Sequence, residues 1–490
     1  MERILIIGGG IAGLTAGIYG QLSGYETEIF EMHTIPGGEC TAWKRGGYTF
    51  DGCIHWMMGT KPGTALNAVW RQTGALDDSV EILLNEEFCR VEMGSRTAIL
   101  YRSIDKTEKH WIEMFPQDRQ AIREMCRAAR AFRRMEMPVE QPMDQMGGLD
   151  AMKMGLKMLP MMGQMAKYNK ITVAELASGF HDPLLRVLIQ NLMPVQYSAM
   201  PLLATMASLD DGDSGYPAGG SLPVALRMEK RYRELGGKVH YSARVERVLV
   251  ESGRAVGIRL ADGNEHRADW VVSCADGRAT LDKLLGGQYR DETMERLYAD
   301  RVSYPVYTTV QVSVGIAADL SNRPHIVSTE AAAPVDAGGI SHDRVGLKNY
   351  SVDKHMAPAG KSVITTTLSA DFDWWRAKKA DPDAYRAEKE RVAREICAVI
   401  ESRYPETKGM IEQVDVATPM TYVRYCDAWR GSWMSFMNTP KGTVRSLPGN
   451  LPGLDRFYMA GQWTMFPGGL PGAALAGKWV IQRIAARQKR

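Results

Sequence analysis

The stretch that decides the fold is RILIIGGGIAG at residues 3–13. Arg3–Ile7 is a short apolar run, which is typical of a strand buried on both faces of a parallel sheet. The glycine loop Gly8–Gly13 follows at once, with the spacing G-x-G-x-x-G. Leu14–Leu22 then has the pattern of a helix, and Glu26–Phe30 that of a second strand. This order predicts the first unit of a Rossmann-like α/β domain.

Each glycine of the GxGxxG loop has a physical task. Gly8 permits the tight turn, Gly10 lets the backbone approach a pyrophosphate, and Gly13 lets helix and strand pack closely. A pyrophosphate is favoured at the helix N-terminus because free N–H groups and the helix dipole attract an anion there. We therefore predict that Gly8, Gly10, Ile11, Ala12 and Gly13 bind a dinucleotide.

Glu31 stands at the end of the second strand. A carboxylate at this place accepts hydrogen bonds from the hydroxyls of an adenosine ribose and repels a 2′-phosphate, so NADP fits this site poorly. The unit on its own leaves FAD and NAD open as alternatives.

Three further segments favour FAD. They are Pro36-Gly37-Gly38 with Gly46–Asp51, then Tyr216–Leu222 with a following helix and the strand pattern Lys238–Val250, and finally Phe457–Trp463 continuing to Pro467–Ala474. In this order and spacing they resemble the phytoene desaturase, carotenoid isomerase and retinol saturase-like flavoproteins, a group within the amine-oxidase-like FAD proteins. No second strand–GxGxxG–helix unit occurs, so a separate binding site for NAD(P)H is not expected.

The resemblance implies a set of FAD contacts. It assigns the adenine-bracketing strand to Val245, and further contacts to Gly37, Gly38, Glu39, Gly461, Gln462, Gly469, Leu470 and Pro471. A helix expected at Ala473–Ala486 would turn its N-terminus toward the flavin and stabilise negative charge on it. Many relatives carry an acid where Gln462 stands, so the role of this position departs from the family pattern.

Two domains with interleaved segments are expected from a chain of 490 residues. We predict a discontinuous FAD-binding domain at 1–85, 215–290 and 448–490, which includes a small antiparallel meander between Lys238 and Ser273. An inserted α+β substrate-binding or cap domain would occupy 86–214 and 291–447. Strands are expected at Tyr307–Gly315 and Ser362–Ser369, and a charged helix at Asp381–Arg403.

Composition excludes several classes of function. The net charge of +3 gives no case for nucleic-acid binding. Seven scattered cysteines without a C-x-x-C pair indicate free thiols in a reducing compartment, and a first strand beginning at Arg3 leaves no room for a signal peptide, so a cytoplasmic protein is expected. No apolar run is long enough to span a membrane, and the histidines show no metal-site spacing.

Two sequence patterns bear on how a substrate or a membrane could be bound. Methionines cluster between Met125 and Met206, which suits either an apolar tunnel or a helical core. Residues Asp118–Met135 have the pattern of an amphipathic helix, with Ile122, Met125, Ala129 and Phe132 on one face and Arg119, Arg123, Arg127, Arg130 and Arg134 on the other. A basic face of this kind suits either solvent or peripheral contact with an anionic membrane.

Few ionisable groups are needed by a flavin enzyme, because the flavin itself exchanges the hydride. His55 is our candidate proton donor or acceptor, since its ordinary pKa is near neutral. Trp56, Tyr425, Trp433 and Trp463 are candidates to line the substrate site. The favoured hypothesis is an FAD-dependent oxidoreductase that desaturates, saturates or isomerises carbon–carbon bonds of a hydrophobic, isoprenoid or polyene substrate, with an unknown electron partner. The alternatives are a flavin amine oxidase and, from another class, a lipid-binding escort-type protein without catalysis.

Overall fold

The computed structural model describes residues 1–442 and 446–488. The predicted segments 291–447 and 448–490 therefore contain a few residues, 443–445 and 489–490, that lie outside the described part. The helices are α1 (Ile11–Leu22), α2 (Ala65–Gln72), α3 (Ile104–Met114), α4 (Arg119–Ala131), α5 (Gly148–Tyr168), α6 (Val173–Ser178), α7 (Pro183–Leu192), α8 (Met200–Asp210), α9 (Ser221–Glu234), α10 (Gly277–Ala279), α11 (Glu292–Ala299), α12 (Phe372–Lys379), α13 (Pro382–Arg403), α14 (Pro419–Cys426) and α15 (Gly469–Gln488).

The strands fall into two larger and three smaller sheets. They are β1 (Arg3–Ile7), β2 (Glu26–Phe30), β3 (Ala42–Arg45), β4 (Tyr48–Asp51), β5 (Met57–Met58), β6 (Ile82–Leu83), β7 (Glu87–Met93), β8 (Arg96–Tyr101), β9 (Ser214–Pro217), β10 (Lys238–His240), β11 (Val245–Glu251), β12 (Arg254–Leu260), β13 (Glu265–Arg267), β14 (Trp270–Ser273), β15 (Thr309–Ile316), β16 (Ile326–Asp336), β17 (Ser341–Asn349), β18 (Ser362–Ser369), β19 (Ile411–Ala417) and β20 (Phe457–Met459).

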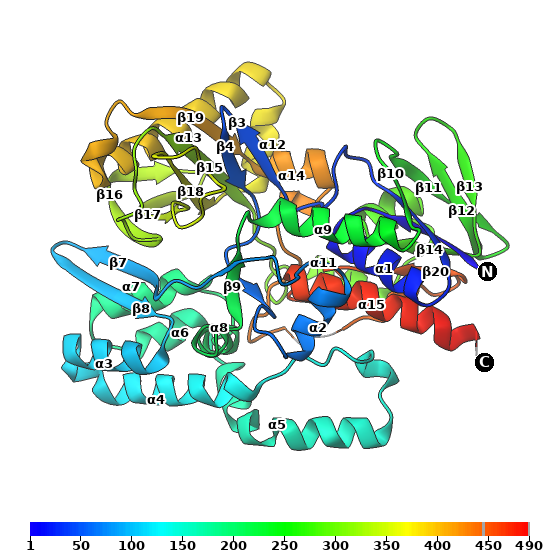
Figure 1. Cartoon of the computed structure of the whole chain (residues 1–490), viewed down its shortest axis with the longest axis horizontal. Coiled ribbons are helices and arrows are strands. Elements are labelled where there is room, and N and C mark those ends of the chain that lie inside the picture. The colour runs from blue at the N-terminus through cyan, green and yellow to red at the C-terminus, as the bar shows by residue number, and fades with distance from the viewer. Residues whose placement is uncertain (443–445, 489–490) are drawn as a thin grey trace.

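A five-stranded parallel sheet in the order β10-β2-β1-β14-β20 forms one half of the molecule (Figure 1). Its strands come from residues 3–30, 238–273 and 457–459, so the chain leaves this sheet and returns to it twice. Helix α1 packs against the C-terminal helix α15, and a Cβ added at Gly477 would lie 2.3 Å from the carbonyl oxygen of Ala12. The first and last helices therefore touch backbone to backbone beside the glycine loop.

The predicted strands and helices of this half hold with three corrections. The first two strands are confirmed, whereas the first helix begins at Ile11 because Gly10 caps it. Lys238–Val250 is wrong as a single strand: Ser242 adopts a left-handed φ of 52°, which separates β10 in the parallel sheet from β11 in the antiparallel meander β11-β12-β13. The last helix begins at Gly469 rather than Ala473, since Pro471 is tolerated in a first helical turn.

The second half is built on a seven-stranded mixed sheet in the order β19-β15-β18-β17-β16-β7-β8. Helix α13 covers one face, where Val392, Ile396 and Ile400 pack into a core with the valines of β15. The predicted strand Ser362–Ser369 is confirmed, the one at Tyr307–Gly315 lies at Thr309–Ile316, and the predicted charged helix is α13 with Asp381 as its cap. Because β7 and β8 join strands from 309–417, residues 86–214 and 291–447 share one sheet; the domain boundaries themselves stay a proposal.

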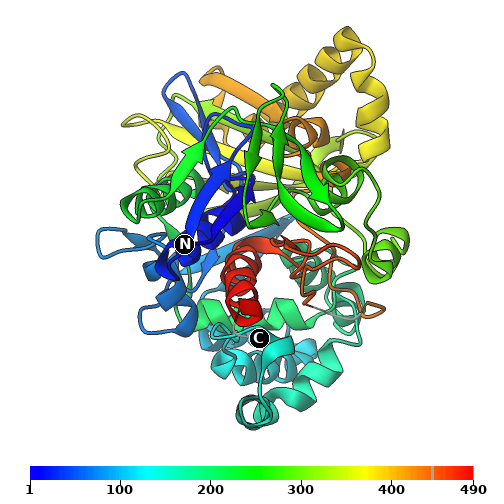
Figure 2. The same ribbon diagram turned by 90° about the vertical axis from the view of Figure 1, so that its right-hand side faces the viewer.

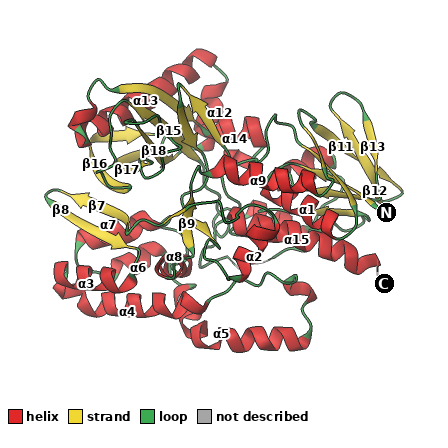
Figure 3. Cartoon of the chain, in the orientation of Figure 1, coloured by secondary structure: helices red, strands yellow, loops and turns green. Residues whose placement is uncertain are grey.

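Helices α3–α8 lie below the seven-stranded sheet, as the colouring by secondary structure shows (Figure 3). The predicted amphipathic helix is α4, followed by a short turn at Phe132–Arg134, and its apolar residues Ile122, Met125, Ala129 and Phe132 are buried as expected. Helix α5 forms the lower edge of the molecule in both views (Figures 1 and 2). Within residues 1–442 and 446–488, no helix is long and apolar enough to cross a membrane.

Candidate functional site

A cavity of ≈ 1330 Å³ runs between the two halves, from the glycine loop to the methionine-rich helices. It is larger than most small-molecule pockets, so it has room for a long ligand or for two ligands side by side. All but one of the residues predicted from the sequence line it: Gly8, Gly10, Ile11, Ala12, Glu31, Gly37, Gly38, Glu39, His55, Trp56, Val245, Tyr425, Trp433, Gly461, Gln462, Trp463, Gly469, Leu470 and Pro471. The exception is Gly13, where a Cβ would lie 1.9 Å from the carbonyl oxygen of Gly8. Gly13 therefore contacts the glycine loop itself and does not border the cavity.

The glycine loop leaves open space on its cavity side. At Gly10, whose φ of −71° suits any residue, an added Cβ would meet only the carbonyl oxygen of Gly37, at 3.8 Å. At Gly469, on the first turn of α15, it would meet nothing within 4 Å. Two helix N-termini, those of α1 and α15, thus border the same cavity with uncovered backbone, which fits a dinucleotide with anionic groups.

Glu31 is buried and holds the loop in place. Its Oε2 accepts a hydrogen bond from the backbone N–H of Gly9 at 2.7 Å, and its Oε1 accepts one from His33 N–H at 2.8 Å. Each carboxylate oxygen has a further lone pair, so Glu31 can still accept from a ribose hydroxyl. Glu31 therefore also anchors the glycine loop.

Glu39 and Gln462 face each other across the cavity wall. The Gln462 amide Nε2 donates to Glu39 Oε2 at 3.1 Å. Burial raises the pKa of Glu39 to about 8, which the bond from Gln462 only partly offsets. The Glu39 carboxyl is therefore largely neutral at pH 7 and adds no charge repulsion toward a nearby phosphate. Where the family resemblance places an acid at position 462, this chain carries its acid at position 39.

The candidate catalytic His55 borders the cavity beside a lysine that sequence reasoning missed. Burial, followed by the charges of Lys348 and His325, lowers the pKa of His55 to about 3, so its imidazole is neutral at physiological pH. Lys348 is 7% exposed, its Nζ donates to the carbonyl oxygen of Ile54 at 3.2 Å, and it lies over the ring of Tyr350. Burial lowers the pKa of Lys348 to about 7. Of these two residues, Lys348 rather than His55 changes charge near neutral pH.

Asp51 ties the cavity wall together and was also missed as a site residue. It is 2% exposed and accepts hydrogen bonds from Tyr216 Oη at 2.7 Å, from the backbone N–H of Ser221 and of Cys53 at 3.0 Å each, and from Ser221 Oγ. Its own carbonyl oxygen accepts from Gln311 Nε2 on β15 at 2.8 Å. Asp51 thus connects β4 to Tyr216 and to the start of α9 through its carboxylate, and to the seven-stranded sheet through its backbone carbonyl.

The four aromatic residues predicted to line the substrate site lie in different surroundings. Trp56 packs edge-on against Phe88, with ring centroids 5.4 Å apart. The indole Nε1 of Trp433 is buried and finds no acceptor among the described residues, so it is free to donate to a ligand. Trp463 belongs to an aromatic cluster with Tyr298, Trp429 and Phe436. Tyr425 lies against His33, at the Glu31 end rather than the substrate end.

One sequence signal could have found the missed lysine. Along β17, the alternate residues His342, Arg344, Gly346 and Lys348 line the cavity, while Val345 and Leu347 belong to the core beneath α13, with Leu347 also touching the cavity. Basic residues that alternate with buried aliphatic ones predict a strand with one polar, functional face. The described residues contain no group of three His, Cys, Asp or Glu side chains that could hold a metal ion.

The protein has a mixed α/β fold with one large cavity that is bordered by the glycine loop and by apolar side chains. The chain belongs to the flavin containing amine oxidoreductase family, whose profile matches residues 11–485. It is 26% identical over 508 residues to the chloroplastic prolycopene isomerase of Daucus carota, covering 98% of this chain and 80% of that protein. It is 25% identical to the lycopene-forming phytoene desaturase of a Paracoccus strain, covering 98% of this chain and 97% of the desaturase.

Among solved structures, the chain is similar to cyclohexylamine oxidase from Brevibacterium oxydans. The TM-score is 0.60 at 13% identity, and the match covers 100% of both chains. A variant of putrescine oxidase gives a TM-score of 0.61 at 12% identity, with 99% of each chain covered. At these identities the likeness establishes the fold, and the family membership establishes a flavin oxidoreductase.

The lowered pKa of Lys348 predicts a pH-dependent stability. Between about pH 7 and pH 10 the unfolded chain holds a proton on this lysine that the folded chain lacks, so the free energy of unfolding rises with pH. We expect the wild type to gain about 3 kcal/mol over this range relative to Lys348→Met. Urea unfolding of the two proteins at a series of pH values measures the difference. Parallel curves for the two proteins would contradict the assignment.

Proposed function

We propose that this protein is an FAD-dependent oxidoreductase that acts on carbon–carbon bonds of an extended, apolar substrate of the polyene or isoprenoid class. Bound FAD would supply two-electron exchange with carbon. The chain would hold its pyrophosphate at Gly8–Gly13, its ribose at Glu31 and its flavin end at Gly468–Pro471. Two relatives that match 98% of this chain, a prolycopene isomerase and a phytoene desaturase, support the substrate class.

The observation that carries this proposal is the chemistry of the cavity wall on the side of residues 86–214. Apolar side chains predominate there, and several are methionines, which adapt to long and irregular ligands. They include Phe88, Met135, Met137, Leu192, Met193, Pro194, Met200 and Pro201. A lining of this kind excludes water and holds a substrate by apolar contact rather than by ionic recognition.

A flavin amine oxidase is the competing function, and the charge of the cavity opposes it. Among the described lining residues of 86–214 and 307–369 none is acidic, whereas Arg344 and Lys348 are basic. The acidic lining residues are Glu31, Glu39, Glu246, Asp276 and Asp427, all outside these two segments, and Asp427 pairs with Arg244 and Lys283. A protonated amine bound against residues 86–214 and 307–369 would therefore meet no counter-charge there, which is unfavourable in a buried site. A neutral polyene meets no such penalty.

Anaerobic flavin spectroscopy separates these functions. We expect an acyclic polyene either to bleach the flavin band of the pure protein or to be converted to an isomer on the reduced protein, and primary amines to do neither. Met193→Glu places a charge on the apolar wall and is expected to slow polyene conversion more than about tenfold. Met410→Glu, at an exposed site, serves as its matched control. Bleaching by amines alone would overturn the proposal in favour of the amine oxidase.

A further inference from the structure

Helix α5 exposes an apolar face that packs against nothing in the described structure. Its residues Leu149, Met152, Leu156, Leu159 and Met162 are 53–71% exposed, and Met143 just before the helix is 45% exposed. The remaining exposed large hydrophobic side chains, such as Leu22, Leu84, Leu226, Val302 and Met410, are dispersed over other elements. Single exposed apolar residues are ordinary, but a contiguous row on one helix marks a surface that binds something.

The helix has two apolar faces and one polar edge. Met161 and Tyr168 are buried and Met154, Met158 and Met165 are partly buried, so this side contacts the body of the protein. At 3.6 residues per turn, the exposed leucines and methionines point away from that side. Lys153, Lys157 and Gln164 occupy the edge between the two faces. An outward apolar face bordered by lysines is the pattern of a helix that lies in a lipid interface.

The charge near α5 suits anionic lipid headgroups. Residues 148–170 contain four lysines (Lys153, Lys157, Lys167 and Lys170) and one acid, Asp150, which gives a net charge of +3. Lys167 pairs with Glu124, and Lys157 makes a looser pair with Glu136 at 3.6 Å while its side chain stays 77% exposed. Long lysine side chains at the edge of an apolar face can reach headgroups while the apolar residues enter the acyl region. A second copy of this chain would instead bring like charges together along the same edges.

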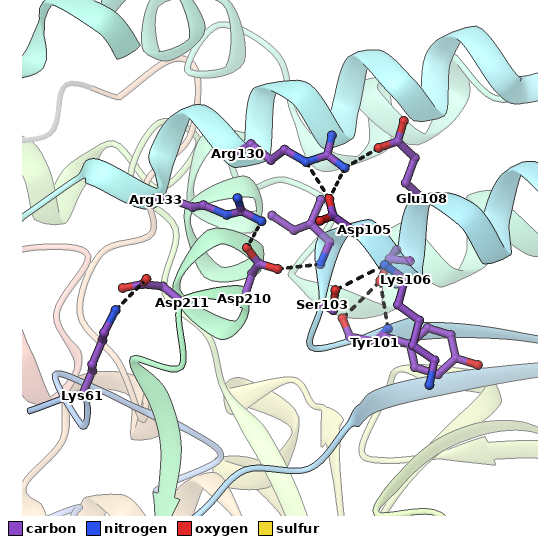
Figure 4. A network of polar contacts seen from close by, with 12 residues as sticks. Lys61, Tyr101, Ser103, Asp105, Lys106, Glu108, Arg130, Arg133, Asp210 and Asp211 are labelled. Carbon is purple, nitrogen blue, oxygen red and sulfur yellow. Dashed lines mark hydrogen bonds and ion pairs between the residues drawn. The ribbon is translucent and has the colours of Figure 1, made fainter.

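The basic helix α4, the membrane contact suggested by sequence alone, is a weaker candidate. Its Arg130 pairs with Asp105 and Glu108, and the neighbouring Arg133 pairs with Asp210 (Figure 4). Arg119, Arg123 and Arg127 are exposed, but the apolar face of α4 is buried, so this helix offers charge without apolar contact. The side chain of Arg134 lies outside the described part.

The segment that leads into α5 also forms part of the cavity wall. Met135, Met137, Pro138 and Met143 line the cavity. The same segment is fixed to the C-terminal helix α15, because Arg483 pairs with Asp144 at 2.5 Å and Gln482 Nε2 donates to the carbonyl oxygen of Glu140 at 2.7 Å. The exposed face of α5 is therefore continuous in sequence with the apolar wall of the cavity.

We propose that α5 docks on an anionic lipid bilayer through Leu149, Met152, Leu156, Leu159 and Met162, with Lys153 and Lys157 at the headgroups. This places the Met135–Met143 wall of the cavity next to the lipid surface, from which an apolar ligand can enter without crossing water. The inference goes beyond the proposed function and stands independently of which bond the enzyme acts on.

Vesicle flotation of the full-length protein tests the proposal. At low salt, the wild type is expected to float with vesicles of equimolar phosphatidylcholine and phosphatidylglycerol. Leu156→Glu/Leu159→Glu is expected to weaken partitioning at least about 30-fold, since two apolar contacts become charged. Lys153→Glu/Lys157→Glu is expected to weaken it about fivefold or more on these vesicles and much less on pure phosphatidylcholine.

Matched variants make the outcome specific to α5. Leu22→Glu/Leu226→Glu changes two leucines on other helices that are 49% and 43% exposed, and is expected to bind like the wild type. Arg123→Glu/Arg127→Glu on α4 is expected to change binding less than about twofold. Circular dichroism and thermal melting confirm that each variant is folded. Three results would overturn the proposal. The first is wild-type protein that stays in the soluble fraction, and the second is vesicle binding that Leu156→Glu/Leu159→Glu leaves unchanged. The third is a wild-type dimer that binds no vesicles and that dissociates in this variant.

Discussion

Replacing Gly10 with valine is expected to abolish FAD binding while the protein stays folded. The backbone at Gly10 is extended, with φ of −71° and ψ of −178°, and an added Cβ would have free space up to the Gly37 carbonyl oxygen at 3.8 Å. The added Cβ would therefore clash with nothing in the protein, and the valine side chain would extend into the place in which a pyrophosphate approaches the backbone. We expect FAD affinity to fall at least about 100-fold, which corresponds to about 2.7 kcal/mol.

A neighbouring glycine supplies the contrasting control. Gly13→Ala would place its Cβ 1.9 Å from the Gly8 carbonyl oxygen, so α1 must move away from β1. This variant is expected to lose FAD and to melt at a much lower temperature, whereas Gly10→Val loses FAD alone. Equilibrium dialysis with FAD and circular dichroism melting of the cofactor-free proteins separate the two effects. Full FAD binding by Gly10→Val would contradict the assignment of the loop.

Replacing Asp51 with alanine is expected to be the most destabilising single change at the cavity. Its carboxylate satisfies Tyr216 Oη and the backbone N–H groups of Ser221 and Cys53 in a buried setting, so its loss leaves these donors unpaired. We expect the free energy of unfolding to fall by about 3–5 kcal/mol. Asp51→Asn keeps one acceptor oxygen and is expected to lose less.

Chemical denaturation measures this prediction directly. Asp78→Ala is a suitable control, because the Asp78 side chain is 90% exposed and pairs only with Arg71 at the surface. Such an exposed pair contributes less than about 1 kcal/mol. Equal destabilisation by Asp51→Ala and Asp78→Ala would refute the role of the Asp51 carboxylate in joining β4 to Tyr216 and the start of α9.

The end of the cavity formed by the glycine loop could be predicted from the sequence because its determinants are local. Gly8, Gly10 and Gly13 act through backbone turns and close approach within a few residues, and the strands on either side have the apolar pattern of a parallel sheet. In the structure, nearly all the residues predicted from the sequence line one cavity. The misplaced boundary at Lys238–Val250 arose because a single residue, Ser242, in a left-handed conformation redirects an otherwise continuous strand pattern.

The substrate end could not be predicted in the same way. Lys348 is buried only because β17 packs between β16 and β18, and its pKa falls only in that setting. Asp51 was visible in the sequence, yet its partners Tyr216 and Ser221 lie more than 160 residues away. The apolar face of α5 reads in sequence like any buried helix, and only the fold shows that it points outward.

The central claim is that this chain holds FAD between the GxGxxG loop and the N-terminus of α15. The most direct test is the visible spectrum of the purified protein, combined with chromatography of the cofactor released on denaturation. We predict absorption bands at about 370 and 450 nm and close to one FAD released per chain. A colourless protein that also fails to take up added FAD would contradict the account and would favour a non-catalytic lipid-binding protein with the same fold.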